Sequence, residues 1–399
     1  MSDADRLARV ALSHLAEPGD VRVLRLVRQL GATTVYEGLC AHGGLDAVLD
    51  GMPDGVSDGA GGAGVDLAVR LGAVRPEQRL EQARRAGIRF VVPGDAEWPT
   101  GLDDLADQPA LHQRGEVPVG LWVRGPLRLD EVRTAVAVVG ARRATTYGGS
   151  VAGDLGQDLG SEGWTVVSGA AFGIDQAAHR GALAAGGPTV AVLACGVDRA
   201  YPVRHSELLD QIGDQGAVVS EAPPGATPTR VRFLGRNRLI AGLARGTVVV
   251  EAAVRSGSLN TAGWAERLSR VVMGVPGPVT SALSQGVHEL IRTRAGLLVT
   301  SGAEVREAVG ESGEHLLAVP RAPLGPRDHL PIRHQQVLDA VPVSRGATVE
   351  TISRGAGIGT KEAGTALGAL ARAGLIEQSG AGWRLSDAAW RADRAEERA

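Results

Sequence analysis

Two glycine-containing turns in this chain combine the residue types that bind phosphate. Each follows an apolar, strand-like run and precedes a helical pattern. Backbone N–H groups at the start of a helix attract anions. Glycine lets a ligand approach the backbone closely, and the planar fork of an arginine can take two phosphate oxygens. The residues predicted to form this anion site are Gly140, Arg142, Ser168, Gly169 and Gly173.

Two further segments add positive charge and small hydroxyl groups. Residues 230–245 carry five arginines and no acid, with one aromatic ring among them. A charge run is also common on a solvated helix face, so the run alone leaves both interpretations open. Interleaved arginine and aromatic residues suit the backbone and bases of a single strand. The contacts predicted from these segments are Arg232, Phe233, Arg236, Asn237, Arg238, Ser256, Gly257 and Ser258.

Asp175 and His179 stand four residues apart, on one face of a predicted helix. This spacing could hold a metal or form an acid–base pair, but it also fits a helix-start acid and a packed histidine. No other His or Cys cluster supports a metal, and no Walker loop or Gly-x-Gly-x-x-Gly motif is present. We therefore predict no metal, no cofactor and no catalytic residue.

Composition and charge narrow the function classes. The chain has 399 residues, 44% hydrophobic and 22% charged, with a formal net charge of -3. Any DNA site must therefore be a local patch. The two cysteines, Cys40 and Cys195, are far apart and fit a reducing compartment. With no signal peptide and no apolar run long enough for a membrane span, we expect a cytoplasmic protein that does not contact membranes.

Between residues 78 and 308, apolar runs alternate with helical patterns. Runs without polar alternation are typical of parallel strands buried on both faces, and helical connections fit right-handed crossovers. We predict an α/β fold, a Rossmann-like doubly wound and mostly parallel sheet, with ligands beyond the carboxyl ends of the strands. The expected strands are 88–92, 135–139, 165–168, 189–193, 217–220, 247–251, 271–275 and 297–300.

The flanking regions are expected to fold separately. Residues 1–75 show short helical patterns and are predicted to form a small helical domain. Prolines mark residues 309–332 as a linker. Residues 333–390 show helical patterns followed by a hairpin pattern, which resembles a winged helix.

Taken in order, these motifs resemble the DprA/Smf family of DNA-processing proteins. Residues 233–243 match the family pattern Phe-x-x-Arg-Asn-Arg-x-Ile-Ala-Gly-Leu, and Cys195-Gly-Val-Asp198 also fits. The Gly-x-Arg triplet has Ala141 where the family usually has Ser or Thr, so a hydroxyl contact is lost there. His288 stands where the family usually has Asn, so that amide role is not assumed.

The resemblance implies a function for the chain. It implies a protein that binds and protects single-stranded DNA and helps load the RecA recombinase, in natural transformation or in recombination. It also implies a homodimer formed through the Rossmann-like domain, no covalent chemistry, and a helical N-terminal domain of the SAM/HhH type. Because aromatic residues make up only 3% of the chain, we expect phosphate contacts to contribute more than base stacking.

Two other functions remain as alternatives. One is a Rossmann-like nucleotide enzyme, similar to the nucleoside monophosphate phosphoribohydrolases, which typically carry Pro-Gly-Gly-x-Gly-Thr followed by a catalytic Glu. Glu251 lacks that glycine context. The other is a nucleotide-sensing module, which a nucleotide titration would separate from a DNA-binding protein.

Overall fold

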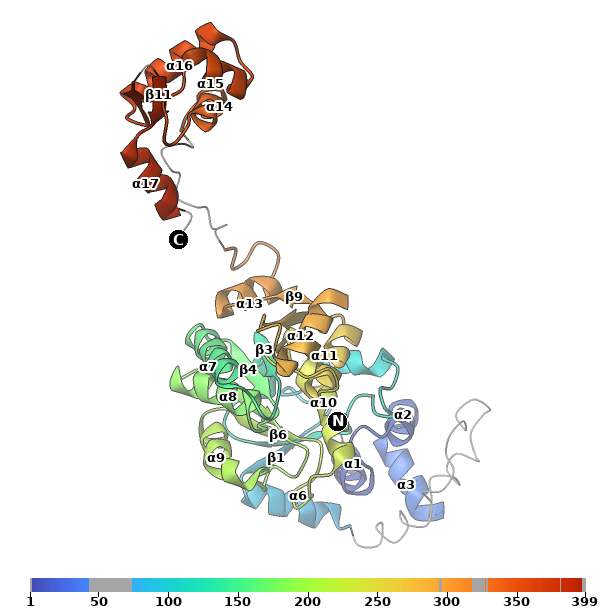
Figure 1. The fold of residues 1–399 in the computed structure, drawn as a ribbon. Helices are drawn as coiled ribbons and strands as arrows, with labels where there is room; N and C mark the ends of the chain where they lie inside the picture. The colour runs from blue at the N-terminus through green and yellow to red at the C-terminus, as the bar shows by residue number, and fades with distance from the viewer. Residues whose placement is uncertain are drawn as a thin grey trace. The chain divides into compact units, whose positions relative to one another are not determined.

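The computed structural model describes residues 2–42, 74–293, 296–317, 327, 329–380 and 382–396. The chain divides into two compact units, Met1–Leu317 and Ala318–Ala399 (Figure 1). The first unit contains the N-terminal helices as well as the predicted Rossmann-like region. Parts of the predicted helical domain 1–75 and of the predicted linker 309–332 lie outside the described residues, so these boundaries stay predictions.

A sheet of nine strands forms the centre of the first unit, in the order β1-β2-β6-β5-β4-β3-β7-β8-β9. Only β2 runs antiparallel to its neighbours β1 and β6; the other pairs are parallel. The mostly parallel α/β fold is therefore confirmed. The strands are β1 Ile88–Val91, β2 Leu121–Arg124, β3 Ala135–Val139, β4 Thr165–Ser168, β5 Thr189–Val192, β6 Ala217–Ser220, β7 Gly246–Val249, β8 Val271–Gly274 and β9 Leu297–Leu298.

All eight predicted strands are present, and β2 is the one that the sequence did not predict. It is only four residues long, Leu-Trp-Val-Arg, and lies between Gly120 and Gly125. Equally short strands, β4 and β6, lie between helical patterns, whereas β2 lies between two short 3-10 helices, Thr100–Asp107 and Leu129–Glu131, so no alternation with long helices marks it. Pairing with β1 and β6 determines its conformation.

Helices cover both faces of this sheet because the central strands are apolar on both sides; every residue of β3 is buried. Alternate residues of β3 belong to two separate cores. One face carries α7 Thr146–Ser161, α8 Ile174–Ala184, α9 Ser206–Gln215 and α13 Gly302–Val309. The other carries α10 Arg230–Gly242, α11 Ser258–Arg267 and α12 Ala282–Thr293.

The strand order reverses at β3. From β3 the chain builds β4, β5 and β6 to one side and then returns to place β7, β8 and β9 on the other. In doubly wound folds, the loops at such a reversal splay apart and leave a crevice beyond the carboxyl ends of the strands. The loops after β3 and β7 should therefore border a ligand site.

The N-terminal helices are α1 Asp3–Leu15, α2 Val21–Leu30 and α3 Ala32–His42, with α6 Pro76–Arg85 preceding the sheet. The turn between α1 and α2 is attached to α10. Gly19 N donates to Glu221 Oε1 at 3.2 Å, and the same carboxylate pairs with Arg238 at 2.7 Å. These helices therefore belong to the frame that holds α10.

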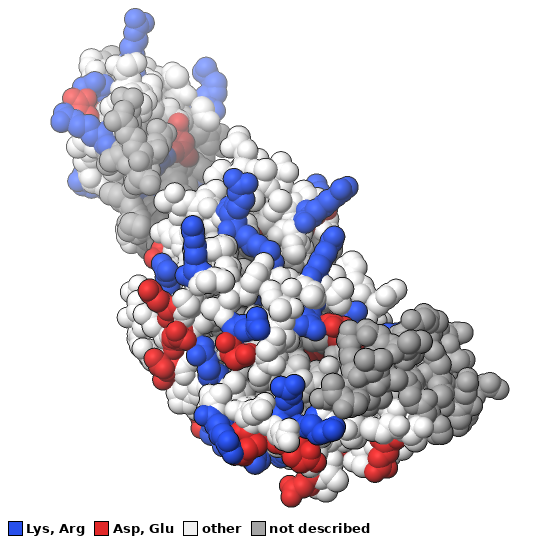
Figure 2. All heavy atoms as spheres, turned by 90° about the horizontal axis from the view of Figure 1, so that it is seen from below, with Lys and Arg blue, Asp and Glu red and all other residues white. Residues whose placement is uncertain are grey.

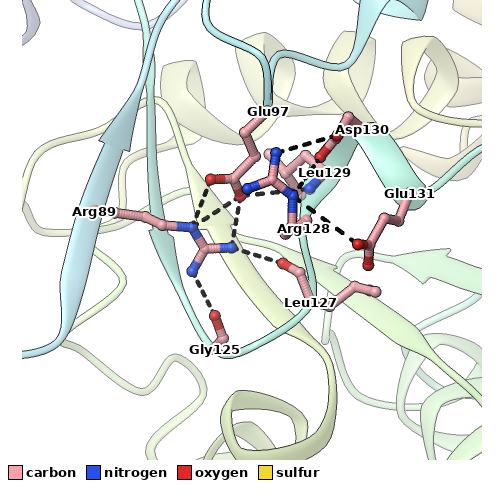
Figure 3. A network of polar contacts seen from close by, with 8 residues as sticks. All are labelled: Arg89, Glu97, Gly125, Leu127, Arg128, Leu129, Asp130 and Glu131. Carbon is pink, nitrogen blue, oxygen red and sulfur yellow. Dashed lines mark hydrogen bonds and ion pairs between the residues drawn. The ribbon is translucent and has the colours of Figure 1, made fainter.

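At the antiparallel edge of the sheet, a polar network centred on Arg89 connects β1 to the segment that follows β2 (Figure 3). Arg89 Nε donates to both oxygens of Glu97, at 2.8 and 2.9 Å, and its two terminal nitrogens donate to Gly125 O and Leu127 O. Nearby, Arg128 pairs with Asp130 at 3.0 Å. These contacts satisfy backbone carbonyls at the edge, so we assign this network a structural role.

The second unit contains α14 Ile332–Ala340, α15 Val349–Ala356 and α16 Thr360–Arg372, then β10 Ile376–Ser379, β11 Gly382–Leu385 and α17 Asp387–Glu396. β10 and β11 form an antiparallel hairpin. The helices and hairpin share one small core that includes Val337, Ile352 and Leu370. Three helices followed by a hairpin is the element order expected for a winged helix, and the assignment to that class stays a prediction.

Candidate nucleic-acid interface

A cavity of about 790 Å³ opens where the strand order reverses. Its walls come from the loops after β3, β4, β5 and β7 and from the first two turns of α10. Of the predicted site residues it brings together Gly140, Arg142, Phe233, Arg236, Asn237, Ser256, Gly257 and Ser258. We call this cavity the anion pocket, for the charges described below.

Arg236 lies at the floor of the anion pocket. Its side chain is only 5% exposed, and Nη1 donates to Val192 O at the end of β5, at 3.1 Å. Its Nε is buried without a partner, and among the described residues the guanidinium forms no ion pair. Burial lowers the pKa of Arg236 to about 10, so the group keeps its charge near neutral pH. Asp175 acts on this guanidinium through its charge, but among the described residues no carboxylate forms an ion pair with it. A buried cation that no adjacent carboxylate neutralises favours an anionic ligand.

Gly169 makes room for this guanidinium. A Cβ at Gly169 would lie 1.5 Å from Arg236 Nη1 and 2.3 Å from its Cζ. No other residue type could stand here without displacing the arginine. Gly169 was predicted to contact the ligand with its backbone, whereas its N–H donates to Asp175 Oδ2 at 3.2 Å.

Asp175 is the one carboxylate that lines the pocket, among the residues described. It is 6% exposed, and Oδ2 also accepts the Ala171 N–H at 3.4 Å. Burial raises the pKa of Asp175, while the charge of Arg236 acts in the opposite direction. The carboxylate holds the turn after β4 by its backbone, which places Gly169 against Arg236.

At the rim, a second arginine lies over an aromatic ring. Arg142 is exposed, and its Cζ is 4.8 Å from the centroid of the Phe233 ring. Arg236 approaches the same ring at 5.8 Å. A guanidinium over a ring face is stabilised by a cation–π interaction. Phe233 therefore holds the two arginines on one side of the pocket.

The opposite wall is the start of α11. Ser256 Oγ lies 2.8 Å from Ser258 Oγ. Asn237 Nδ2 donates to Gly257 O at 3.4 Å and to Asn260 Oδ1 at 3.1 Å, so α10 positions this loop. N–H groups and hydroxyls at a helix N-terminus are donors suited to an anion.

Five predicted residues lie outside the pocket lining. Ser168 is fully buried and donates to Val138 O at 2.6 Å. Gly173, with φ +80°, packs against the carbonyl of Ala141, which a Cβ would approach to 2.2 Å. Gly169 is the third. Ser168, Gly169 and Gly173 therefore shape the turns, and their contact with a ligand stays a prediction.

Arg232 and Arg238 are the other two predicted residues outside the lining. Arg238 is fully buried, and its guanidinium pairs with Glu221 at 2.7 Å and donates to Gly115 O at 2.9 Å. Arg232 pairs with Glu17 at 2.8 Å. Both arginines are neutralised by carboxylates from elsewhere in the chain and attach α10 to the N-terminal helices, and their contact with a ligand stays a prediction.

Of the lining residues that the sequence reasoning did not place in the site, four carry basic or aromatic side chains. Arg230 and Arg255 belong to segments already singled out, and Tyr201 follows the Cys195-Gly-Val-Asp198 motif. His112 comes from the segment before β2 and carries no sequence pattern that predicts it. Its place at the rim depends on the fold.

Asp175 and His179 do not form an acid–base pair. His179 is fully buried, and its Nδ1 lies 2.7 Å from Thr189 Oγ1. The Thr189 hydroxyl itself donates to Val166 O, so it accepts from the histidine. Burial lowers the pKa of His179 to about 3 and keeps the ring neutral. Among the described residues, no three His, Cys, Asp or Glu side chains lie together in a group that could hold a metal ion.

Glu251 occupies the N-terminus of α7, the helix that follows β3. Its carboxylate accepts Thr145 N at 2.9 Å and Thr145 Oγ1 at 2.5 Å. A Cβ at Gly148 would lie 2.4 Å from Glu251 Oε2, so the glycine lets the carboxylate in. Dinucleotide-binding folds place a pyrophosphate at the start of the corresponding helix. In this chain, a carboxylate of the protein fills that position.

Basic and acidic side chains are interspersed on the face drawn in Figure 2. The anion pocket has an excess of positive charge, because among the described residues Arg142, Arg230, Arg236 and Arg255 face a single lining carboxylate, Asp175. Among the helices described, none combines the length and the hydropathy needed to cross a membrane.

Comparisons with known proteins agree with this geometry. A family model described as DNA recombination-mediator protein A matches residues 89–310. The putative DNA processing protein DprA of Mycobacterium tuberculosis H37Rv is 42% identical over 392 residues, 96% of this chain and 95% of the relative. Protein Smf of Escherichia coli K12 is 38% identical, over 58% of this chain and 59% of the relative.

Among solved structures, the X-ray structure of DNA processing protein A from Streptococcus pneumoniae is similar to this fold. It aligns with a TM-score of 0.60 at 30% identity and covers 78% of this chain and 99% of that chain. The similarity therefore includes both the sequence motifs and the arrangement of the sheet that carries the pocket.

Proposed function

We propose that this chain, which belongs to the DprA/Smf family of DNA-processing proteins, binds single-stranded DNA in the anion pocket. The observation that carries the proposal is Arg236, a buried guanidinium at the pocket floor that forms no ion pair among the described residues. A phosphate of the DNA backbone would bring a negative charge into direct contact with it. Arg142 and the donors at the start of α11 would hold the neighbouring oxygens.

The shape of the site supports a single strand over a duplex. Arg236 is 5% exposed, so a phosphate must enter the cavity to reach it. The flexible backbone of a single strand can bend into such a recess, whereas the phosphates of a stiff duplex lie on a regular cylinder. Contacts to phosphate carry no sequence information, so binding should be largely independent of sequence.

We further propose that the protein delivers the bound strand to a RecA recombinase, in DNA uptake or in recombination. The description of the matching family as a recombination-mediator protein supports this role. We expect the protein to act in the cytoplasm and by binding, without covalent chemistry. The Glu251 carboxylate fills the start of α7, where dinucleotide-binding enzymes hold a pyrophosphate, so we do not expect a nucleotide to bind there in the same way.

We also propose that the protein forms a homodimer through the first unit, which contains the nine-stranded sheet. The outermost strand β9 exposes Leu297 and Leu298, 49% and 54% respectively. An exposed apolar edge strand is a common pairing surface. Sedimentation of the purified protein would test it: Leu297→Lys should lower the mass from dimer to monomer, and a wild-type monomer would contradict the proposal.

The test of DNA binding is a titration with single- and double-stranded oligonucleotides of the same length, at two salt concentrations. We expect tighter binding of the single strand, with affinity falling as salt rises. Arg236→Ala should weaken binding, whereas Arg245→Ala should not, because Arg245 ends the same arginine-rich segment but donates to Arg133 O outside the pocket. Equal affinity for the duplex would instead favour the second unit as the DNA-binding part.

A further inference from the structure

The exposed aromatic side chains of the first unit gather at one edge of the sheet. Among its described residues, the exposed aromatic rings are Tyr147 (43%), Phe172 (39%) and Tyr201 (42%). They follow β3, β4 and β5 respectively, in the segments at the carboxyl ends of these strands. The remaining aromatic rings there are buried or half-buried.

The segments that carry Tyr201 and Phe172 both contribute to the lining of the anion pocket. Tyr201 lines it, and its ring centroid lies 5.7 Å from that of Phe233, with the planes tilted by 54°. Phe172 follows Ala171, which also lines the pocket. The exposed Tyr201 ring therefore packs beside Phe233 and its arginines, and the exposed Phe172 ring stands one residue from the lining in the chain.

The two loops that carry these rings are fastened to each other. His205, four residues after Tyr201, lies 2.9 Å from Ala170 O through its Nδ1. Its ring packs edge-on against Phe172, with centroids 4.5 Å apart. His205 is only 2% exposed. His205, in the loop after β5, therefore supports the loop after β4, and it fixes the position of the Phe172 ring.

A third contact holds the base of the Tyr201 loop. Both carboxylate oxygens of Asp198 accept the Gly225 N–H at 2.9 Å. The loop is thus tied to the segment that leads into α10. Rings held in place before binding lose little conformational entropy when a ligand stacks on them.

We propose that Tyr201 and Phe172 form a stacking site for unpaired nucleobases of the same strand whose phosphate Arg236 binds. This inference rests on the proposed function and extends it from the phosphates to the bases. The ligand class is a nucleic acid strand with unstacked, unpaired bases, since only these present a free ring face.

The positive charge of the pocket beside the exposed rings indicates that the ligand is a nucleic acid strand. The pocket beside the rings is lined by Arg142, Arg230, Arg236 and Arg255 against one carboxylate. Arginines next to exposed rings match a strand in which phosphates and bases alternate. From the low aromatic content of the chain, we expected base stacking to contribute less than phosphate contacts. The exposed rings, however, stand in segments that line the pocket, which favours a larger contribution from stacking.

The experiment compares two single strands with the same number of phosphates: a thymidine oligonucleotide of about 16 nucleotides and an oligomer of the same length with abasic sites. Each stacked base contributes about 5- to 100-fold in affinity, so wild-type protein, with two stacking rings, should bind the thymidine strand about 25- to 10,000-fold more tightly. Tyr201→Leu and Phe172→Leu should each weaken binding of the thymidine strand by about 5- to 100-fold. Both variants should leave the affinity for the abasic strand unchanged.

Matched variants separate stacking from loss of structure. Tyr201→Phe keeps the ring and should retain wild-type affinity. Tyr147→Leu removes an equally exposed ring that lies outside the pocket lining, with its hydroxyl on Pro276 O, and should also retain it. The inference is overturned if wild-type protein binds both strands equally, or if Tyr201→Leu and Phe172→Leu weaken both alike. If wild-type protein binds neither the thymidine strand nor the abasic strand, the proposed function itself is overturned.

Discussion

Gly169→Ala tests how the anion pocket is built, because it removes no charge and no hydrogen-bonding group. The added Cβ would lie 1.5 Å from Arg236 Nη1, so the guanidinium must leave its place beside Val192 O. The clash involves the far end of a flexible side chain, and Gly169 is not among the positive-φ residues, so we expect the variant to fold. We predict that Gly169→Ala weakens single-stranded DNA binding almost as much as Arg236→Ala.

The magnitude follows from the contact that is lost. A hydrogen bond from a charged group contributes about 1.5–3 kcal/mol, which corresponds to about 10- to 100-fold in affinity. Losing one phosphate contact should also reduce the slope of log K against log salt by about 0.7. Fluorescence anisotropy with a labelled single strand measures both quantities, and thermal unfolding checks the fold.

The double variant supplies the decisive comparison. If Gly169 acts only by admitting Arg236, Gly169→Ala/Arg236→Ala should bind no more weakly than Arg236→Ala alone. Additive effects of the two changes would show that Gly169 contacts the DNA itself. Wild-type affinity in Gly169→Ala, with the protein folded, would refute the proposed position of Arg236 in binding.

Three further predictions concern other parts of the molecule. Arg142→Ala should weaken single-strand binding and lower the salt slope by about 0.7, since Arg142 is the exposed arginine over Phe233; an unchanged slope in an oligonucleotide titration would contradict its phosphate contact. Deleting residues 328–399 should change single-strand affinity by less than about threefold, or about 0.7 kcal/mol, because α16 carries few basic residues; a tenfold loss in a protein that stays folded by circular dichroism would show that the second unit binds the strand. Burial lowers the pKa of His179 from 6.5 to about 3, so between these pH values the unfolded chain binds more protons than the folded chain. As the pH is lowered below about 6.5, the free energy of unfolding should therefore decrease, by up to about 1.4 kcal/mol per pH unit. Urea unfolding at several pH values should show a shallower slope for His179→Gln, and an identical slope would mean that another group is responsible.

Much of the sheet could be predicted from the sequence because its central strands are apolar on both faces. The run 135–139, for example, is β3, buried throughout. β2 could not be predicted, since its four residues become a strand only by pairing with β1 and β6. An apolar run in the sequence identifies a strand that is buried on both faces, whichever strands pair with it.

The arginines of α10 show where sequence reasoning ends. Arg232, Arg236 and Arg238 look equivalent in the sequence, yet Arg232 pairs with Glu17 and Arg238 pairs with Glu221. Among the described residues, Arg236 forms no ion pair. These partners come from residues far away in the chain. Only the fold decides which arginine keeps a charge available for a ligand.

The most direct test of the central claim is a crystal structure of the protein with a short thymidine oligonucleotide. The account predicts a phosphate oxygen of the strand about 2.7–2.9 Å from a guanidinium nitrogen of Arg236, inside the anion pocket. A strand bound on another surface, with no phosphate in contact with Arg236, would contradict it.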